Sequence, residues 1–81
     1  MDSGLQTDIN TYVHKLIAEC GKCKNNAVSK LEAGLLAYSL AGNNTGIAKV
    51  CNEYLISGDK SLTKDGITMV KCLANVCKWY V

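Results

Sequence analysis

The sequence predicts an all-α protein, a compact bundle of four short helices in a single domain spanning residues 1–81. Three observations predict this fold. Apolar residues recur at helical spacing in four segments, breaks rich in glycine and asparagine separate the segments, and no proline interrupts a helix. With 81 residues, 48% of them hydrophobic and 20% charged, the chain has the size and composition of one folded globular domain.

The first helix is expected to lie close to the N-terminus and to end at Gly21. Its start is open, because residues 3–6 fit a capping box while Thr7 or Asp8 could cap a shorter helix. The apolar face that predicts this helix consists of Ile9, Val13, Leu16, Ile17 and Cys20.

The second helix is expected to open at the Asn25–Asn26 pair, a favoured N-cap signal, and to end at Gly42. It carries two apolar stripes: one of Val28, Leu31, Leu35 and Tyr38, and a second beside it of Leu36 and Leu40. Because this helix is apolar over such a wide arc, we expect it to be the central helix of the bundle.

The third helix is expected to begin near Asn44 or Thr45 and to stop at residues 57–58. The fourth is expected to use Thr63 as its N-cap, with Leu62 and Ile67 at the two positions of a hydrophobic staple. The connecting loops are short, so successive helices should pack beside one another.

Composition and motifs argue against several functions. The net charge is only +2, all nine basic residues are lysines, and no apolar run is long enough to span a membrane. The chain has one histidine, His14, on the polar side of its helix, and none of the common catalytic or phosphate-binding motifs. We therefore expect no enzyme, no catalytic residue, no cofactor and no metal. Residues 1–10 lack a signal-peptide pattern, which predicts a cytoplasmic location.

Five cysteines, an unusual number for this length, leave three chemical states open. Cys20, Cys51 and Cys77 lie in the apolar stripes of their helices, as expected of small core residues. Disulfides are the second state. The third is a zinc site, because Cys20 with Cys23 and Cys72 with Cys77 form two pairs of thiols.

The order of these cysteines also resembles a known family. Cys20-x-x-Cys23 near one end and Cys72-x4-Cys77 near the other resemble the outer bridges of saposin-like proteins, which are helical, lipid-binding and membrane-permeabilising. The resemblance implies disulfides across the domain and a secreted, membrane-active protein as one alternative function. That family has six cysteines, whereas here Cys51 is left without a partner.

Residues 36–50 also fit the pattern of a helix-turn-helix, in which two helices cross steeply over small residues. Its apolar positions hold Leu36, Leu40, Ile47 and Val50, and its small positions hold Ala37 and Ala41. In such a unit the second helix would present Asn43, Asn44, Thr45, Lys49 and Asn52 to nucleic acid. A small DNA-binding protein, dimeric like many of its kind, is therefore a second alternative function.

The leading hypothesis is a non-enzymatic helical interaction protein. It would act as a regulator, inhibitor or accessory factor by docking on a larger protein partner, and a homodimer is also open. Tyrosine and tryptophan are favoured anchors of protein interfaces. The predicted contact residues are accordingly Tyr12, Trp79 and Tyr80.

Overall fold

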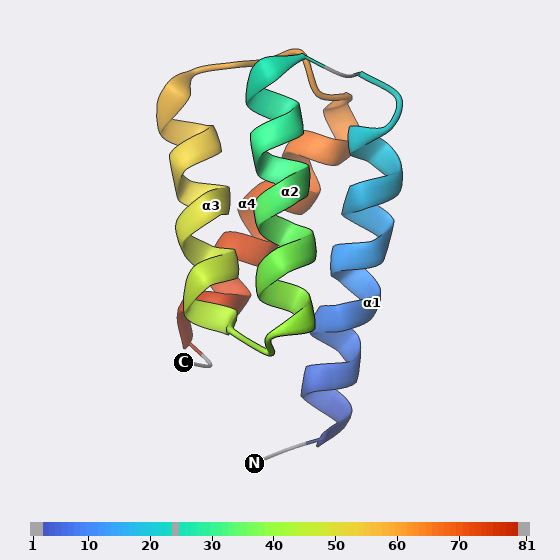
Figure 1. Ribbon diagram of the computed structural model, residues 1–81, viewed down its shortest axis with the longest axis vertical. Helices are drawn as coiled ribbons and strands as arrows, with labels where there is room; N and C mark the ends of the chain where they lie inside the picture. The colour runs from blue at the N-terminus through green and yellow to red at the C-terminus, as the bar shows by residue number, and fades with distance from the viewer. Residues whose placement is uncertain (1–2, 24, 80–81) are drawn as a thin grey trace.

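The computed structural model of the protein describes residues 3–23 and 25–79, with side chains described from residue 7 onward in these ranges. The described residues form four helices and no strand: α1 (Ser3–Cys20), α2 (Asn26–Leu40), α3 (Asn44–Ser57) and α4 (Lys64–Trp79). The predicted all-α, four-helix fold is confirmed (Figure 1). Helix α1 begins at Ser3, the earlier of the two predicted starts.

The four helices run alternately up and down (Figure 1). Each contacts only two of the others, and the two short dimensions of the molecule are 21 and 20 Å, so the helices lie at the corners of a square. α1 packs against α2 and α4, and α3 packs against the same two helices. The prediction that α2 is the central helix is wrong. It occupies a corner like the other three. A helix at a corner has one side turned to solvent, so only part of its apolar surface can be buried.

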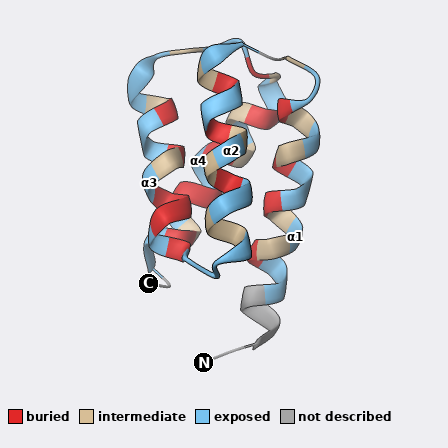
Figure 2. Cartoon of the chain, in the orientation of Figure 1, coloured by how far each residue is buried: buried red, intermediate tan, exposed pale blue. Residues whose placement is uncertain are grey.

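The core receives side chains from every helix (Figure 2). The largest fully buried side chains are Leu16, Leu31, Leu35, Ile47 and Leu73. The predicted first stripe of α2 faces this core, since Val28, Leu31 and Leu35 are buried and Tyr38 packs against them. The hydrophobic effect of this shared core is the main force that holds the four helices together.

Side-chain caps fix where three helices begin. Asn25, Asn43 and Thr63 accept hydrogen bonds from the backbone N–H groups of Val28, Gly46 and Gly66, at 2.9, 2.9 and 3.0 Å respectively. The predicted caps Asn25 and Thr63 are therefore confirmed, and each satisfies a backbone donor that the helix itself leaves unpaired. Gly58, at a φ of 74°, ends α3 in the left-handed conformation that favours glycine.

Polar contacts tie the helix ends to one another. Asn25 Nδ2 donates to Asp59 Oδ2 at 3.2 Å and to the Ser61 hydroxyl, which joins the start of α2 to the α3–α4 connection. The Thr63 hydroxyl donates to Glu19 Oε2 at 2.6 Å, which joins the end of α1 to the start of α4. Hydrogen bonds to these carboxylates, chiefly from Ser61 and Thr63, hold the pKa values of Asp59 and Glu19 below their usual range.

Candidate docking surface

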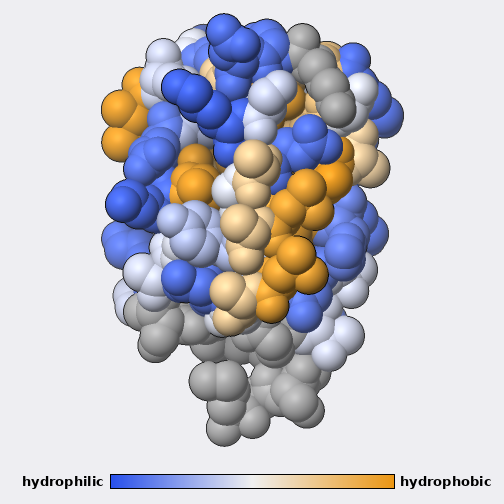
Figure 3. Space-filling view, in the orientation of Figure 1, coloured by the Kyte–Doolittle hydropathy of each residue, from blue (hydrophilic) through white to orange (hydrophobic). Residues whose placement is uncertain are grey.

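An apolar stripe runs along the outer side of α2, and the space-filling view shows apolar residues gathered over this helix (Figure 3). Leu40 is 89% exposed and Leu36 is 44% exposed. With three exposed alanines they follow the i, i+3, i+4, i+7, i+8 spacing of a single helix face. This surface, called the α2 stripe below, consists of Ala33, Leu36, Ala37, Leu40 and Ala41.

Close packing between α2 and α3 turns this stripe outward. Gly34 of α2 and Gly46 of α3 each lie against a side chain of the opposing helix. A Cβ at position 34 would lie 2.6 Å from Val50 Cγ1, and one at position 46 would overlap the ring of Tyr38. The side of α2 that carries Gly34 and Tyr38 therefore faces α3, and the stripe lies on the side turned away from the core.

The stripe contains four of the six residues that predicted a helix-turn-helix. In that unit Leu36, Leu40, Ala37 and Ala41 belong at the crossing of two helices. In the structure these four residues are exposed, and α2 and α3 run antiparallel side by side (Figure 1). The two helices form an antiparallel hairpin, because the glycine contacts bring their backbones together along their length instead of at one steep crossing.

Four of the five residues predicted to contact nucleic acid are exposed, and the fifth, Asn44, is buried. Thr45, Lys49 and Asn52 are exposed on α3. Asn43 uses its side-chain oxygen to cap that helix. Asn44, expected to face solvent, is buried at 9% exposure, because the first turn of α3 directs it into the bundle. The prediction that Asn44 faces solvent is therefore wrong.

The residues predicted to contact a protein partner lie apart from the α2 stripe. Trp79 is 80% exposed at the end of α4, the helix diagonally opposite α2. Tyr12 is half-buried on α1, where a hydrogen bond with the Cys72 thiol is the main cause of a raised pKa of its hydroxyl. Tyr80 lies outside the described residues.

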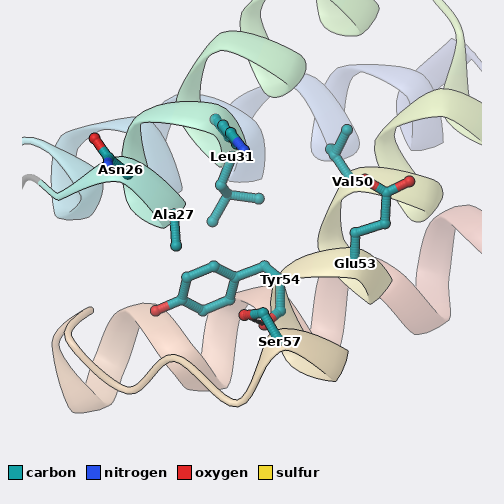
Figure 4. Close-up of a pocket in the computed structure, with 8 residues that line it drawn as sticks. Asn26, Ala27, Leu31, Val50, Glu53, Tyr54 and Ser57 are labelled. Atoms are coloured by element: carbon teal, nitrogen blue, oxygen red, sulfur yellow. Dashed lines mark hydrogen bonds between the residues drawn. The ribbon is translucent and has the colours of Figure 1, made fainter.

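A groove of about 400 Å³ opens between α2 and α3, at the ends farther from their connecting turn (Figure 4). Leu31 and Tyr54 line its apolar part, and Asn26, Glu53 and Ser57 lie around it. The Tyr54 hydroxyl is already engaged, since it donates to Asp59 and accepts from the Leu62 N–H at 3.3 Å. The groove therefore offers a surface of mixed apolar, polar and charged side chains.

The cysteines divide into a buried set and an accessible set. Cys20, Cys51 and Cys77 are buried, Cys23 is half-buried and Cys72 is exposed. Burial raises the pKa of the Cys51 thiol to about 12 and that of Cys77 to about 11, so both stay neutral at physiological pH. These two thiols are core residues, as the apolar stripes predicted.

The structure does not assemble the disulfides or the zinc site that the sequence left open. The described cysteines form no disulfide, and α1 and α4 end at opposite ends of the bundle, which separates Cys20 from Cys77. Within residues 3–23 and 25–79, no three His, Cys, Asp or Glu side chains come close enough together to bind a metal ion. In the same part of the chain, no helix has the length and apolar character that a bilayer crossing requires.

No family model, no curated protein and no solved structure matches this chain.

Proposed function

We propose that this protein is a non-enzymatic docking protein that binds a larger protein partner through the α2 stripe. One observation carries the proposal: five apolar residues on one regular helix face are turned to solvent, and Leu40 at 89% exposure is the most prominent of them. A contiguous apolar patch of this kind marks an interaction surface more often than an isolated exposed leucine does.

The chemistry of the stripe suits a helix of the partner. Ala33, Ala37 and Ala41 recur every four residues, so the backbone of an opposing helix can approach closely while Leu36 and Leu40 supply buried area. Full burial of a leucine contributes about 1.5–3 kcal/mol. No charged residue occurs from Ala33 to Ala48, so docking leaves no charge of this segment buried and unpaired.

The proposal places the docking in the cytoplasm, where thiols are kept reduced. The absence of disulfides among the described cysteines supports this location. The identity of the partner determines whether the protein acts as a regulator, an inhibitor or an accessory factor.

Site-specific photo-crosslinking in a lysate of the natural host tests the proposal. A photoreactive residue replaces Ala37 in the stripe, and a matched protein carries it at Ile56, an exposed apolar position on α3. We expect one larger protein to be crosslinked from position 37 and not from position 56, and we expect Leu40→Glu to abolish the product. Equal products from both positions, or no larger product, would contradict the proposal.

Nuclease treatment of half the lysate separates this function from DNA binding. A protein partner is recovered equally from both halves. A product that disappears after nuclease treatment would indicate an assembly on nucleic acid through the exposed residues Thr45, Lys49 and Asn52.

A further inference from the structure

We infer that, when no partner is bound, the α2 stripes of two copies pair antiparallel about a two-fold axis between Leu36 and Ala37, and so cover the docking surface. The inference rests on the proposed function, because it assigns a form of regulation to the same stripe. Self-association and docking then compete for one surface, and the free protein hides its exposed leucines from other apolar surfaces.

The order of large and small residues fits this register. A two-fold axis between positions 36 and 37 places residue i opposite the partner residue whose number is 73 minus i. Leu40 of each copy then lies over Ala33 of the other, and the Leu36 side chains meet beside the axis, where Ala37 leaves room. A large residue therefore faces a small one on both sides of the axis, which is the self-complementarity that a two-fold interface requires.

Charge complementarity favours the same arrangement. The last turn of α2 has no basic residue of its own to balance the negative end of the helix dipole. The exposed Lys30 lies near the beginning of α2, at the edge of the stripe. Antiparallel pairing brings Lys30 of each copy to the carbonyl end of the other copy's α2, where a cation is stabilised by the helix dipole. The charge-free segment from Ala33 to Ala48 places no like charges across the axis.

The size of the stripe sets the strength of the pair. Ala33 and Ala41 are separated by about 12 Å along the helix, at a rise of about 1.5 Å per residue. Such a short contact buries much less area than a standard stable interface. The pair is accordingly weak and depends on concentration, which allows a larger partner to displace it.

Sedimentation of the purified full chain over micromolar to millimolar concentrations tests the pairing. We expect a reversible monomer–dimer equilibrium. Leu40→Glu should weaken it at least about tenfold, because a charge would be buried against Ala33 of the other copy. The matched variant Ile56→Glu, which adds the same charge at an exposed apolar position of α3, should leave the equilibrium unchanged. Lys30→Glu should also weaken the dimer, since it places an anion at a helix C-terminus.

Cysteine crosslinking tests the register, in a protein whose accessible thiols Cys23 and Cys72 are changed to serine. The two copies of residue 37 are offset by only about 1.5 Å along the helices, whereas the two copies of residue 41 are offset by about 14 Å. Ala37→Cys should therefore form a disulfide-linked dimer on mild oxidation, and Ala41→Cys should not, because a disulfide needs Cα atoms within about 7 Å.

Three results would overturn the inference: a monomer at every concentration, a dimer that Leu40→Glu leaves unchanged, or crosslinking at position 41 as efficient as at position 37. None of these would contradict docking on a larger protein, which the photo-crosslinking in lysate tests separately. Conversely, a dimer of the expected register with no larger crosslinked product would uphold the inference and refute the proposed function.

Discussion

Gly34 of α2 lies directly against the side chain of Val50 of α3, in a contact that has no room for another carbon atom: a Cβ at position 34 would lie 2.6 Å from Val50 Cγ1. Valine in a helix has essentially one χ1 rotamer, so Val50 cannot turn aside easily. This contact helps to set the rotation of α2 about its own axis. The rotation of α2 in turn decides which apolar stripe enters the core and which faces solvent.

The variant Gly34→Ala should lower the free energy of unfolding by about 1–3 kcal/mol, the usual cost of an added carbon in a well-packed contact. The loss should appear although alanine is a better helix former than glycine by about 1 kcal/mol. Urea unfolding followed by circular dichroism measures it.

Combining this variant with Val50→Ala supplies the control. The second change removes the methyl groups that the new Cβ would meet, so the double variant should lose less stability than the sum of the two single variants. Additive losses would show that Val50 is not the obstacle.

Asn25 and Asn43 offer a matched pair of capping residues. Each caps a helix through its side-chain oxygen, and Asn25 also binds Asp59 and Ser61 through its side-chain nitrogen. Asn43→Ala should cost about 1 kcal/mol, the usual value of an N-cap. Asn25→Ala should cost more, because the contact with the α3–α4 connection is lost as well. Equal losses in thermal unfolding would show that this contact contributes nothing.

Thiol labelling under native conditions should divide the cysteines into two kinetic classes. Cys72 is exposed and Cys23 is half-buried, so both should react rapidly with a thiol reagent such as Ellman's reagent. Cys20, Cys51 and Cys77 are buried and should react only when the protein opens. Cys72→Ser should remove one rapid equivalent. Five rapid equivalents in the folded protein would contradict the packing described here.

Stability should decline in alkaline solution because of the buried thiols. The pKa of Cys51 is raised from 9.0 to about 12 by burial and, to a lesser degree, by Cys77 and Cys20. Above pH 9.0 the unfolded chain loses this proton while the folded protein keeps it. The stabilisation is therefore fully present below that pH and is lost progressively between pH 9.0 and about 12.

Urea unfolding of Cys51→Ala at a series of pH values isolates this effect. The variant should be less stable at every pH, because it leaves a cavity, and its stability should decline less steeply in alkaline solution. The comparison of slopes is needed because burial also raises the pKa of Tyr54, which contributes in the same direction. Identical slopes would show that Cys51 does not titrate as described.

Features that depend on neighbouring residues were predictable from the sequence. The caps Asn25 and Thr63 and the left-handed glycine Gly58 each act within one turn of their own helix, so the local pattern contains the information. The buried stripes were predictable for the same reason, since helical spacing brings their members to one face.

Features that depend on packing between helices were not predictable in the same way. The sequence of α2 has apolar residues around much of its circumference. Helical periodicity therefore identifies two apolar stripes but does not show which of them enters the core. The expectation of a central helix implied that Leu36 and Leu40 would be covered, but both are exposed. The contacts of Gly34 and Gly46 decide which face of α2 turns towards α3, and these contacts are visible only when the opposing side chains are placed. An alanine at every fourth position beside the two leucines was the available signal for the α2 stripe.

The square arrangement of the helices also has a consequence for how the chain folds. Three of its four sides join helices that are consecutive in the sequence, and only the α1–α4 side joins distant segments. Most contacts are therefore local, a topology that folds fast because little loop-closure entropy is lost before contacts form. The α1–α4 side closes the longest loop and should be the last to form, and the Glu19–Thr63 hydrogen bond across it should belong to the late, native-only contacts that slow unfolding.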